Sequence, residues 1–103
     1  MTLEIDAQAW VYVMVQNPDK EDQIVGQFDA ENDISFIPLF MDKESATQGM
    51  LHMAKEIGKK YEIQAIIFED LERYAAESST LLFVLDDQGK MIDKRVPFQG
   101  KAQ

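Results

Sequence analysis

Apolar and polar positions along this chain follow two different periods, and each period predicts a different kind of element. Dense apolar runs rich in β-branched and aromatic residues predict strands. The runs lie at 10–15, 24–28, 34–40, 63–68, 81–85 and 91–98. Because 63–68 and 81–85 are apolar on both faces, we expect them to be central strands covered on both sides. Gly26 suggests a bulge in the second run, which is the weakest.

Segment 42–60 has a helical period instead. Its apolar residues recur at spacings of three and four, so they share one face of a helix. They are Ala46, Met50, Met53, Ala54, Ile57 and then Tyr61. Asp42 is a suitable N-cap with Glu44 in the first turn, and Gly58 marks the last turn. Lysines suit the C-terminal end of the helix dipole, and they stand at Lys55, Lys59 and Lys60.

Gly49 and Pro38 each predict a feature of how the elements pack. Gly49 weakens the helix but flanks its apolar stripe, where it would let a neighbouring backbone approach closely. Pro38 has no N–H, so we expect it at an edge, a bulge or a strand end, where no ladder partner is needed.

A second, shorter helix follows the fourth strand. Asp70 is expected to cap it, with Leu71, Tyr74 and Ala75 facing inward. Turn residues Asp86 to Gly89 then predict a closing hairpin, and the end of the chain, 100–103, should fray. The element order is therefore β-β-β-α-β-α-β-β. This order predicts an α+β fold in which one mixed sheet of five to six strands packs with two helices, as a single domain spanning 1–103.

Charge and composition limit the partners. The 103 residues hold 10 Lys plus Arg against 19 Asp plus Glu, which gives a formal net charge of -9. Nucleic acids and anionic membranes are bound largely through clustered Lys and Arg, and the longest basic clusters here are Lys59-Lys60 and Lys94-Arg95. We therefore expect no nucleic-acid partner and no membrane partner.

The absence of Cys and the first residues of the chain exclude further classes of protein. Without Cys there is no disulfide framework, thiol nucleophile or Cys-based zinc site. The N-terminal segment carries Glu4 and Asp6 where a secretory signal would carry positive charge. Every apolar run, 81–85 included, is far shorter than the roughly 20 residues of a membrane-spanning helix. We expect a soluble, cytoplasmic protein.

His52 is the single imidazole. On the expected helix it lies nearly opposite the apolar stripe, with only Glu56 as a suggestive neighbour, so we interpret it as a solvated surface residue. The serines lack a G-x-S-x-G context, and neither G-x-G-x-x-G nor a P-loop motif is present. The carboxylates Glu69 and Asp70 begin a helix, where capping explains them. The sequence thus nominates no catalytic and no cofactor-binding residue.

Three acidic clusters invite comparison with metal sites. They are Asp19 with Glu21 and Asp22, Asp29 with Glu31 and Asp33, and Asp86 with Asp87. The second resembles the first half of an EF-hand loop, but Ile34 stands where that loop needs Gly and Phe40 where it needs a bidentate Glu. We interpret all three as solvated loop acids and expect no metal or other cofactor.

Part of the sequence resembles a known family. The run Ile37-Pro38-Leu39-Phe40, then Asp42-Lys43-Glu44 and Ala46 at the head of a helix, resembles SseB amino-terminal-type domains. The resemblance covers mainly 34–57, with 81–96 fitting as the later hairpin. These are small bacterial α+β modules, and the resemblance implies no catalytic residues. The segment 82–90 is also similar to the last hairpin of thioredoxin-like folds, where a chain without Cys would be redox-inactive.

The favoured hypothesis is a non-enzymatic interaction or regulatory module that binds a protein or peptide through a helix face or a strand edge. The alternative is a small-ligand-binding protein or an enzyme that uses acidic residues in a pocket with Tyr12, Tyr61 or Tyr74 as polar contacts. A third hypothesis is a homodimer that buries Pro38 and an edge strand. Methionines can line an adaptable groove, although core packing explains them equally: Met14, Met41, Met50 and Met53.

Overall fold

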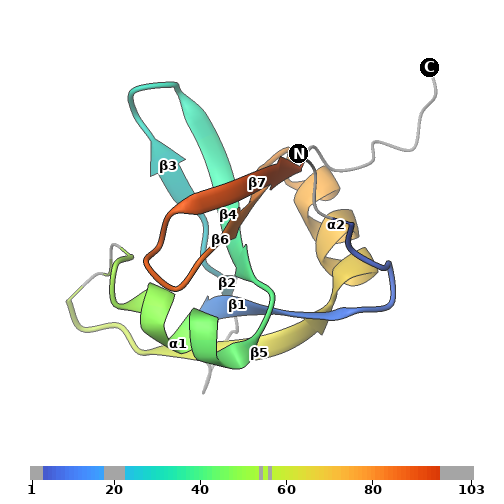
Figure 1. Ribbon diagram of the computed structural model, residues 1–103. Helices are drawn as coiled ribbons and strands as arrows, with labels where there is room; N and C mark the ends of the chain where they lie inside the picture. Colours follow the sequence, from blue (N-terminus) through green and yellow to red (C-terminus); the bar gives the residue numbers. More distant parts are fainter. Residues whose placement is uncertain (1–3, 18–22, 54, 56, 96–103) are drawn as a thin grey trace.

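The computed structural model describes residues 4–17, 23–53, 55 and 57–95, which form seven strands and two helices (Figure 1). The elements are β1 (Trp10–Gln16), β2 (Gln23–Ile24), β3 (Gln27–Asp29), β4 (Ile34–Phe40), α1 (Lys43–Met50), β5 (Tyr61–Ile67), α2 (Phe68–Glu77), β6 (Leu81–Leu85) and β7 (Met91–Arg95). The predicted α+β class, with one mixed sheet and two helices, is confirmed. The sheet has seven strands because the predicted strand 24–28 is divided into β2 and β3.

The sheet has the order β2-β1-β4-β6-β7, with β3 also paired to β4 and β5 to β1. β4 and β6 run parallel, and the other pairs are antiparallel. Since β5 follows β1 along its whole length, β2 and β4 must share the opposite edge of β1. The segment from β2 to β3 therefore passes from β1 to β4. Gly26 lies at this bend, where a Cβ would be 3.5 Å from the Phe36 carbonyl oxygen, and not in a bulge.

Pro38 lies in the interior strand β4, whereas its missing N–H predicts an edge, a bulge or a strand end. It is buried and stands in register with Phe83 of β6. Along the other side of β4, residues up to Phe36 pair with β3, and residues from Leu39 onward pair with β1. The proline thus occupies a junction between two partner strands, where its missing N–H is tolerated. Pro38 is buried within the single chain, so it does not lie on an exposed sheet edge.

The prediction of two central strands is correct for β6 and wrong for β5. β6 lies between β4 and β7, and its Leu82, Val84 and Leu85 are buried. β5 lies at the border of the sheet, at the bottom of Figure 1, and β1 is the strand paired with it among the described residues. Its apolar sequence therefore reflects packing on the two faces and not a position between two strands.

Alternation along the strands sends side chains to two faces, and each face carries one helix. The α2 face holds the larger cluster of buried residues: Val11, Val13, Val15, Ile37, Leu39, Phe68, Leu71, Ala75, Leu82 and Val84. The α1 face holds a smaller one, made of Phe40, Ala46 and Leu85, against which four half-buried side chains pack. Phe40 and Leu85 directly follow Leu39 and Val84, so the two clusters lie on opposite sides of the sheet.

α1 starts as predicted but ends about ten residues early. The Ser45 N–H donates to Asp42 Oδ1 at 2.7 Å, which confirms the N-cap. After Met50 the chain continues as turns, with His52 N–H bonded to the Gly49 carbonyl, and the Lys55 ammonium donates to the Met50 carbonyl at 2.7 Å. Ile57 is fully exposed, so the apolar stripe does not extend along a helix to 60.

Gly49 has the packing role that the sequence predicts. A Cβ at this position would overlap the Phe40 ring, lie 2.8 Å from its Cζ and lie 3.2 Å from the Asp86 carbonyl oxygen. Glycine therefore lets α1 lie directly against β4 and the β6–β7 turn.

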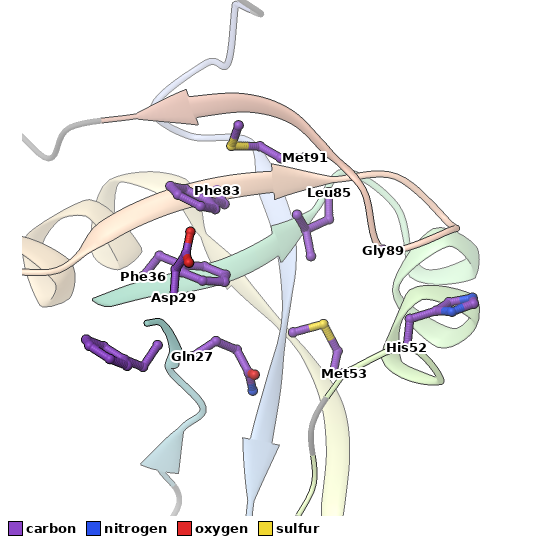
Figure 2. A pocket seen from close by; sticks show the side chains of 10 residues that line it. Gln27, Asp29, Phe36, His52, Met53, Phe83, Leu85, Gly89 and Met91 are labelled. Carbon is purple, nitrogen blue, oxygen red and sulfur yellow. The ribbon is translucent and has the colours of Figure 1, made fainter. Parts of the chain in front are cut away.

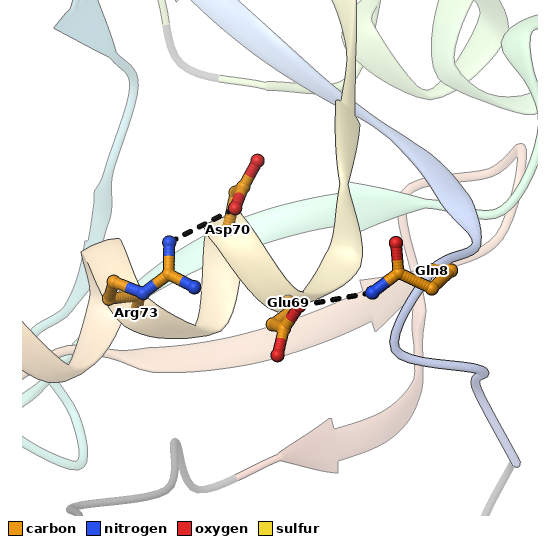
Figure 3. A network of polar contacts seen from close by, with 4 residues as sticks. All are labelled: Gln8, Glu69, Asp70 and Arg73. Carbon is orange, nitrogen blue, oxygen red and sulfur yellow. Dashed lines mark hydrogen bonds and ion pairs between the residues drawn. The ribbon is translucent and has the colours of Figure 1, made fainter.

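α2 begins at Phe68 without a side-chain cap, so the cap predicted at Asp70 is wrong. Its first N–H groups bond instead to the N-terminal segment: Phe68 N to Ala9 O and Glu69 N to Ala7 O, both at 2.9 Å. Gln8 Nε2 donates to Glu69 Oε1 at 3.0 Å, and Arg73 pairs with Asp70 (Figure 3). The two backbone bonds to Ala9 and Ala7 thus satisfy N–H groups at the helix N-terminus from outside the helix.

The inward face of α2 is partly as predicted. Leu71 and Ala75 are buried, but Tyr74 is 41% exposed. The closing hairpin is confirmed: β6 and β7 pair around a turn in which Gly89 has φ +79°. The end of the predicted strand, 96–98, and the segment 100–103 expected to fray lie outside the described residues. Across the ranges that the structure describes, the helices are too short and too polar to span a membrane.

Candidate binding groove

An open cavity of about 370 Å³ lies on the α1 face of the sheet, on the part that α1 does not cover (Figure 2). We call it the groove. Its lining comes from β3, β4, β6, β7 and the turns after α1 and β6: Gln27, Phe28, Asp29, Phe36, His52, Met53, Phe83, Leu85, Gly89 and Met91. The shortness of α1 explains the opening. The eight residues of α1 span only about 12 Å. The α1 residue Ala46 packs beside Phe40 of β4. Phe36 lies about 13 Å further back along the same strand.

Two stacked phenylalanines form the floor of the groove. The rings of Phe36 and Phe83 are 4.2 Å apart between centroids and inclined by 14°. β4 and β6 are adjacent parallel strands, which places the two side chains next to each other on the same face. Both are half-buried, so one side of the aromatic pair is accessible to a ligand.

The wall on the β7 side is apolar and exposed. Met91 stands in register with Leu85 and is 52% exposed. Lys94 is the cross-strand partner of Phe83, so its side chain emerges on the same face beside the groove. The register shift between Val84 and Leu85 makes Ile92 the extra residue of a bulge. An exposed thioether beside an aromatic floor is typical of adaptable apolar binding surfaces.

The end of the groove near α1 is fixed by a close contact between two turns. A Cβ at Gly89 would lie 2.9 Å from the His52 Cβ, so the β6–β7 turn packs directly on the segment after α1. His52 is exposed, which confirms its predicted position at the surface, although it lies in a turn and not on a helix. In Figure 2 its ring points away from the groove, whereas Met53 points toward it.

Asp29 is the carboxylate of the groove lining, and it is engaged in the β3–β4 turn. Its Oδ1 accepts from the Glu31 N–H at 3.1 Å, and its Oδ2 accepts from Asn32 Nδ2 at 2.9 Å. The Asn32 side-chain amide lowers the pKa of Asp29 below its ordinary value. A carboxylate held ionised in this way is a poor general acid at neutral pH. His52 and Asp29 also lie at different ends of the groove in Figure 2.

The other acidic residues considered as metal ligands have turn roles. Asp86 Oδ1 accepts from the Gln88 and Lys90 N–H groups, each at 2.9 Å, and the bond from Lys90 is the main cause that lowers the pKa of Asp86. The described residues contain no group of three His, Cys, Asp or Glu side chains placed to hold a metal ion. Asp19, Glu21 and Asp22 lie outside those residues.

The three tyrosines considered as polar contacts lie apart. Tyr12 packs on the α1-side cluster, Tyr61 begins β5, and Tyr74 lines a second cavity of about 270 Å³. The other residues lining that cavity are Gln16, Gln23, Ile24, Val25 and Gly26. The arrangement of tyrosines and acids that the alternative hypothesis requires is therefore not found in either cavity.

The methionines divide between core and groove. Met14 is buried, Met50 is half-buried at the end of α1, and Met41 is exposed outside the groove. Met53 does line the groove, as the sequence hypothesis allows. Sequence reasoning missed Phe36, Phe83 and Met91, which do most to define the site. The available signal was the two-faced apolar character of the strands, which we interpreted as cover on both sides.

No protein-family model, curated protein or solved structure matches this chain. The resemblance to SseB amino-terminal-type domains thus stays a prediction. The function has to be argued from the groove itself.

Proposed function

We propose that this protein is a small non-catalytic interaction module whose groove binds an extended segment of a partner protein. The observation that carries the proposal is the accessible Phe36–Phe83 stack in an open cavity of about 370 Å³. Aromatic residues and methionine are enriched at protein interfaces, where a few well-placed side chains provide most of the binding energy.

The shape and lining of the groove favour a peptide over a small substrate. The groove is open to solvent along one side; Met91 of its lining is 52% exposed, and the next residue of β7, Ile92, is 49% exposed. A small molecule is normally enclosed over most of its surface. An extended segment instead needs a trough that accepts alternate side chains. The partner segment is expected to carry aromatic or long aliphatic residues.

The lining also supports a binding role over a catalytic one. Its ionisable side chains are Asp29, which is held ionised by the β3–β4 turn, and His52, whose ring points outward. Acid–base catalysis requires a proton donor and acceptor within hydrogen-bond reach of one substrate. These two residues lie at different ends of the cavity (Figure 2).

Site-specific photo-crosslinking in the source cell tests the proposal. A photoreactive phenylalanine analogue replaces Met91, and a matched control carries it at exposed Glu77 on α2. A discrete protein adduct is expected from position 91 and not from position 77. With the purified partner, Met91→Asp should weaken binding at least tenfold, which corresponds to about 1.4 kcal/mol, while Glu77→Lys should change it less than twofold. Equal labelling at both positions, or an adduct of small-molecule mass, would refute the proposal.

A further inference from the structure

Among the described residues, β5 is the longest border strand of the sheet, and its outer edge lacks the usual protective features. Natural edges are blunted by short strands, bulges, prolines or charged side chains. β2 and β3 are only 2 and 3 residues long, and β7 contains a bulge together with Lys94. β5 extends over 7 residues without proline or lysine, and Glu62 is its single charge. Such an edge is a template for another strand.

The hydrogen-bond register shows which groups β5 presents. Phe68 N bonds to Ala9 O and Asn17 N bonds to Lys60 O, at the two ends of the β1–β5 ladder. Because hydrogen-bonded pairs alternate along an antiparallel ladder, the even-numbered residues of β5 face β1. The N–H and C=O groups of Ile63 and Ala65 therefore point outward, as does the N–H of Ile67, whose C=O begins the α2 helix.

We propose that β5 pairs antiparallel with β5 of a second copy, which makes the protein a two-fold symmetric dimer with a continuous sheet. Full overlap places the two-fold axis at Gln64. Ile63 then lies opposite the partner's Ala65 and Tyr61 opposite the partner's Ile67. All of these side chains are on the α1 face, since they stand in register with Met14, Tyr12, Gln16 and Trp10 of β1. The cross-strand pairs on that face are thus entirely apolar.

Charge complementarity specifies a second copy of this chain as the occupant. Lys59 and Lys60 directly precede β5, and Glu69 and Asp70 directly follow it. Antiparallel self-pairing brings the basic residues that precede one strand toward the acidic first turn of α2 that follows the partner's strand. A parallel arrangement would place like charges together at each end. The opposite signs therefore favour the isologous, antiparallel contact.

This surface is distinct from the groove, so the two proposals can fail independently. Sedimentation equilibrium of the full chain should give twice the monomer mass of 11.8 kDa at micromolar concentration. Ala65→Pro removes one outward N–H while sparing the bonds to β1, and should shift the protein to monomer. Ala65→Lys places a charge on the exposed edge with little backbone strain, and should weaken dimerisation at least tenfold even if the proline variant fails to fold.

A charge exchange tests the register. Lys59→Glu alone and Glu69→Lys alone should each weaken the dimer several-fold, and the double variant should recover most of the loss. Lys94→Glu and Glu77→Lys make the same charge changes at exposed positions outside β5 and should leave the dimer intact. A monomeric wild-type protein at 100 µM, a dimer indifferent to Ala65→Lys, or a double variant that is weaker than both single variants would overturn the inference.

Discussion

Replacement of Gly49 by alanine separates two opposing effects at one helical position. In an exposed helix interior, alanine is more favourable than glycine by about 1 kcal/mol. At Gly49, the new Cβ would overlap the Phe40 ring and approach the Asp86 carbonyl oxygen to 3.2 Å. Phe40 is 1% exposed, so its ring has no outward path.

The magnitude follows from the comparison. Forcing an extra methyl group into a well-packed contact costs about 1–3 kcal/mol, and the helix-propensity gain offsets only about 1 kcal/mol of this. Gly49→Ala should therefore lower the free energy of unfolding by up to about 2 kcal/mol, because the steric cost exceeds the gain in propensity. With a urea m-value of about 1–2 kcal/mol/M, the midpoint should fall by roughly 1 M.

The assay is urea unfolding followed by far-ultraviolet circular dichroism at one fixed protein concentration, since self-association would make stability concentration-dependent. Gln48→Ala, at the exposed neighbouring position, is the control and should change stability by less than about 0.5 kcal/mol. In a Phe40→Leu background the smaller side chain leaves room, so Gly49→Ala should become neutral or stabilising. A wild-type background in which Gly49→Ala raises stability by about 1 kcal/mol would refute the packing argument.

Two further predictions concern carboxylates. Asp42→Ala removes the N-cap bond to Ser45 and should cost about 1 kcal/mol in the same assay, whereas Asp87→Ala in the β6–β7 turn serves as an exposed control. The pKa of Asp86 is lowered mainly by the Lys90 N–H, so its ionised form contributes stability above its ordinary pKa of 3.8 and loses that contribution as pH falls through the lowered value. Asp86→Asn should therefore melt below wild type at pH 6 and approach it near pH 2 in thermal scans; a constant gap would contradict this.

Sequence patterns correctly predicted the elements in which local residue preferences and tertiary packing favour the same structure. β1, β4 and the β6–β7 hairpin are rich in β-branched or aromatic residues or carry strong turn chemistry, and they formed as predicted. The end of α1 was not predictable from periodicity, because Met53 and Ile57 keep the helical spacing after the helix has stopped. The Met50 carbonyl is bound by the Lys55 ammonium, a contact that spacing alone does not reveal.

The groove is open because α1 ends early, at Met50. Apolar side chains on both faces of β6 predicted cover on both sides, but the helix that would have covered Phe36 and Phe83 is too short to reach them. The start of α2 shows a similar limit. Its N–H groups bond to Ala7 and Ala9, some sixty residues away in the chain, so no local cap signal was needed. The site therefore arises from tertiary contacts that sequence patterns do not encode locally.

The unequal cover of the two sheet faces has an evolutionary consequence. The α2 face contains most of the buried core, so substitutions at Leu71 or Val84 are constrained by stability. Met91 and Ile92 are about half exposed and are largely free of that constraint. Selection can therefore change the exposed surface of β7 in descendants of this protein while the scaffold that holds it stays the same.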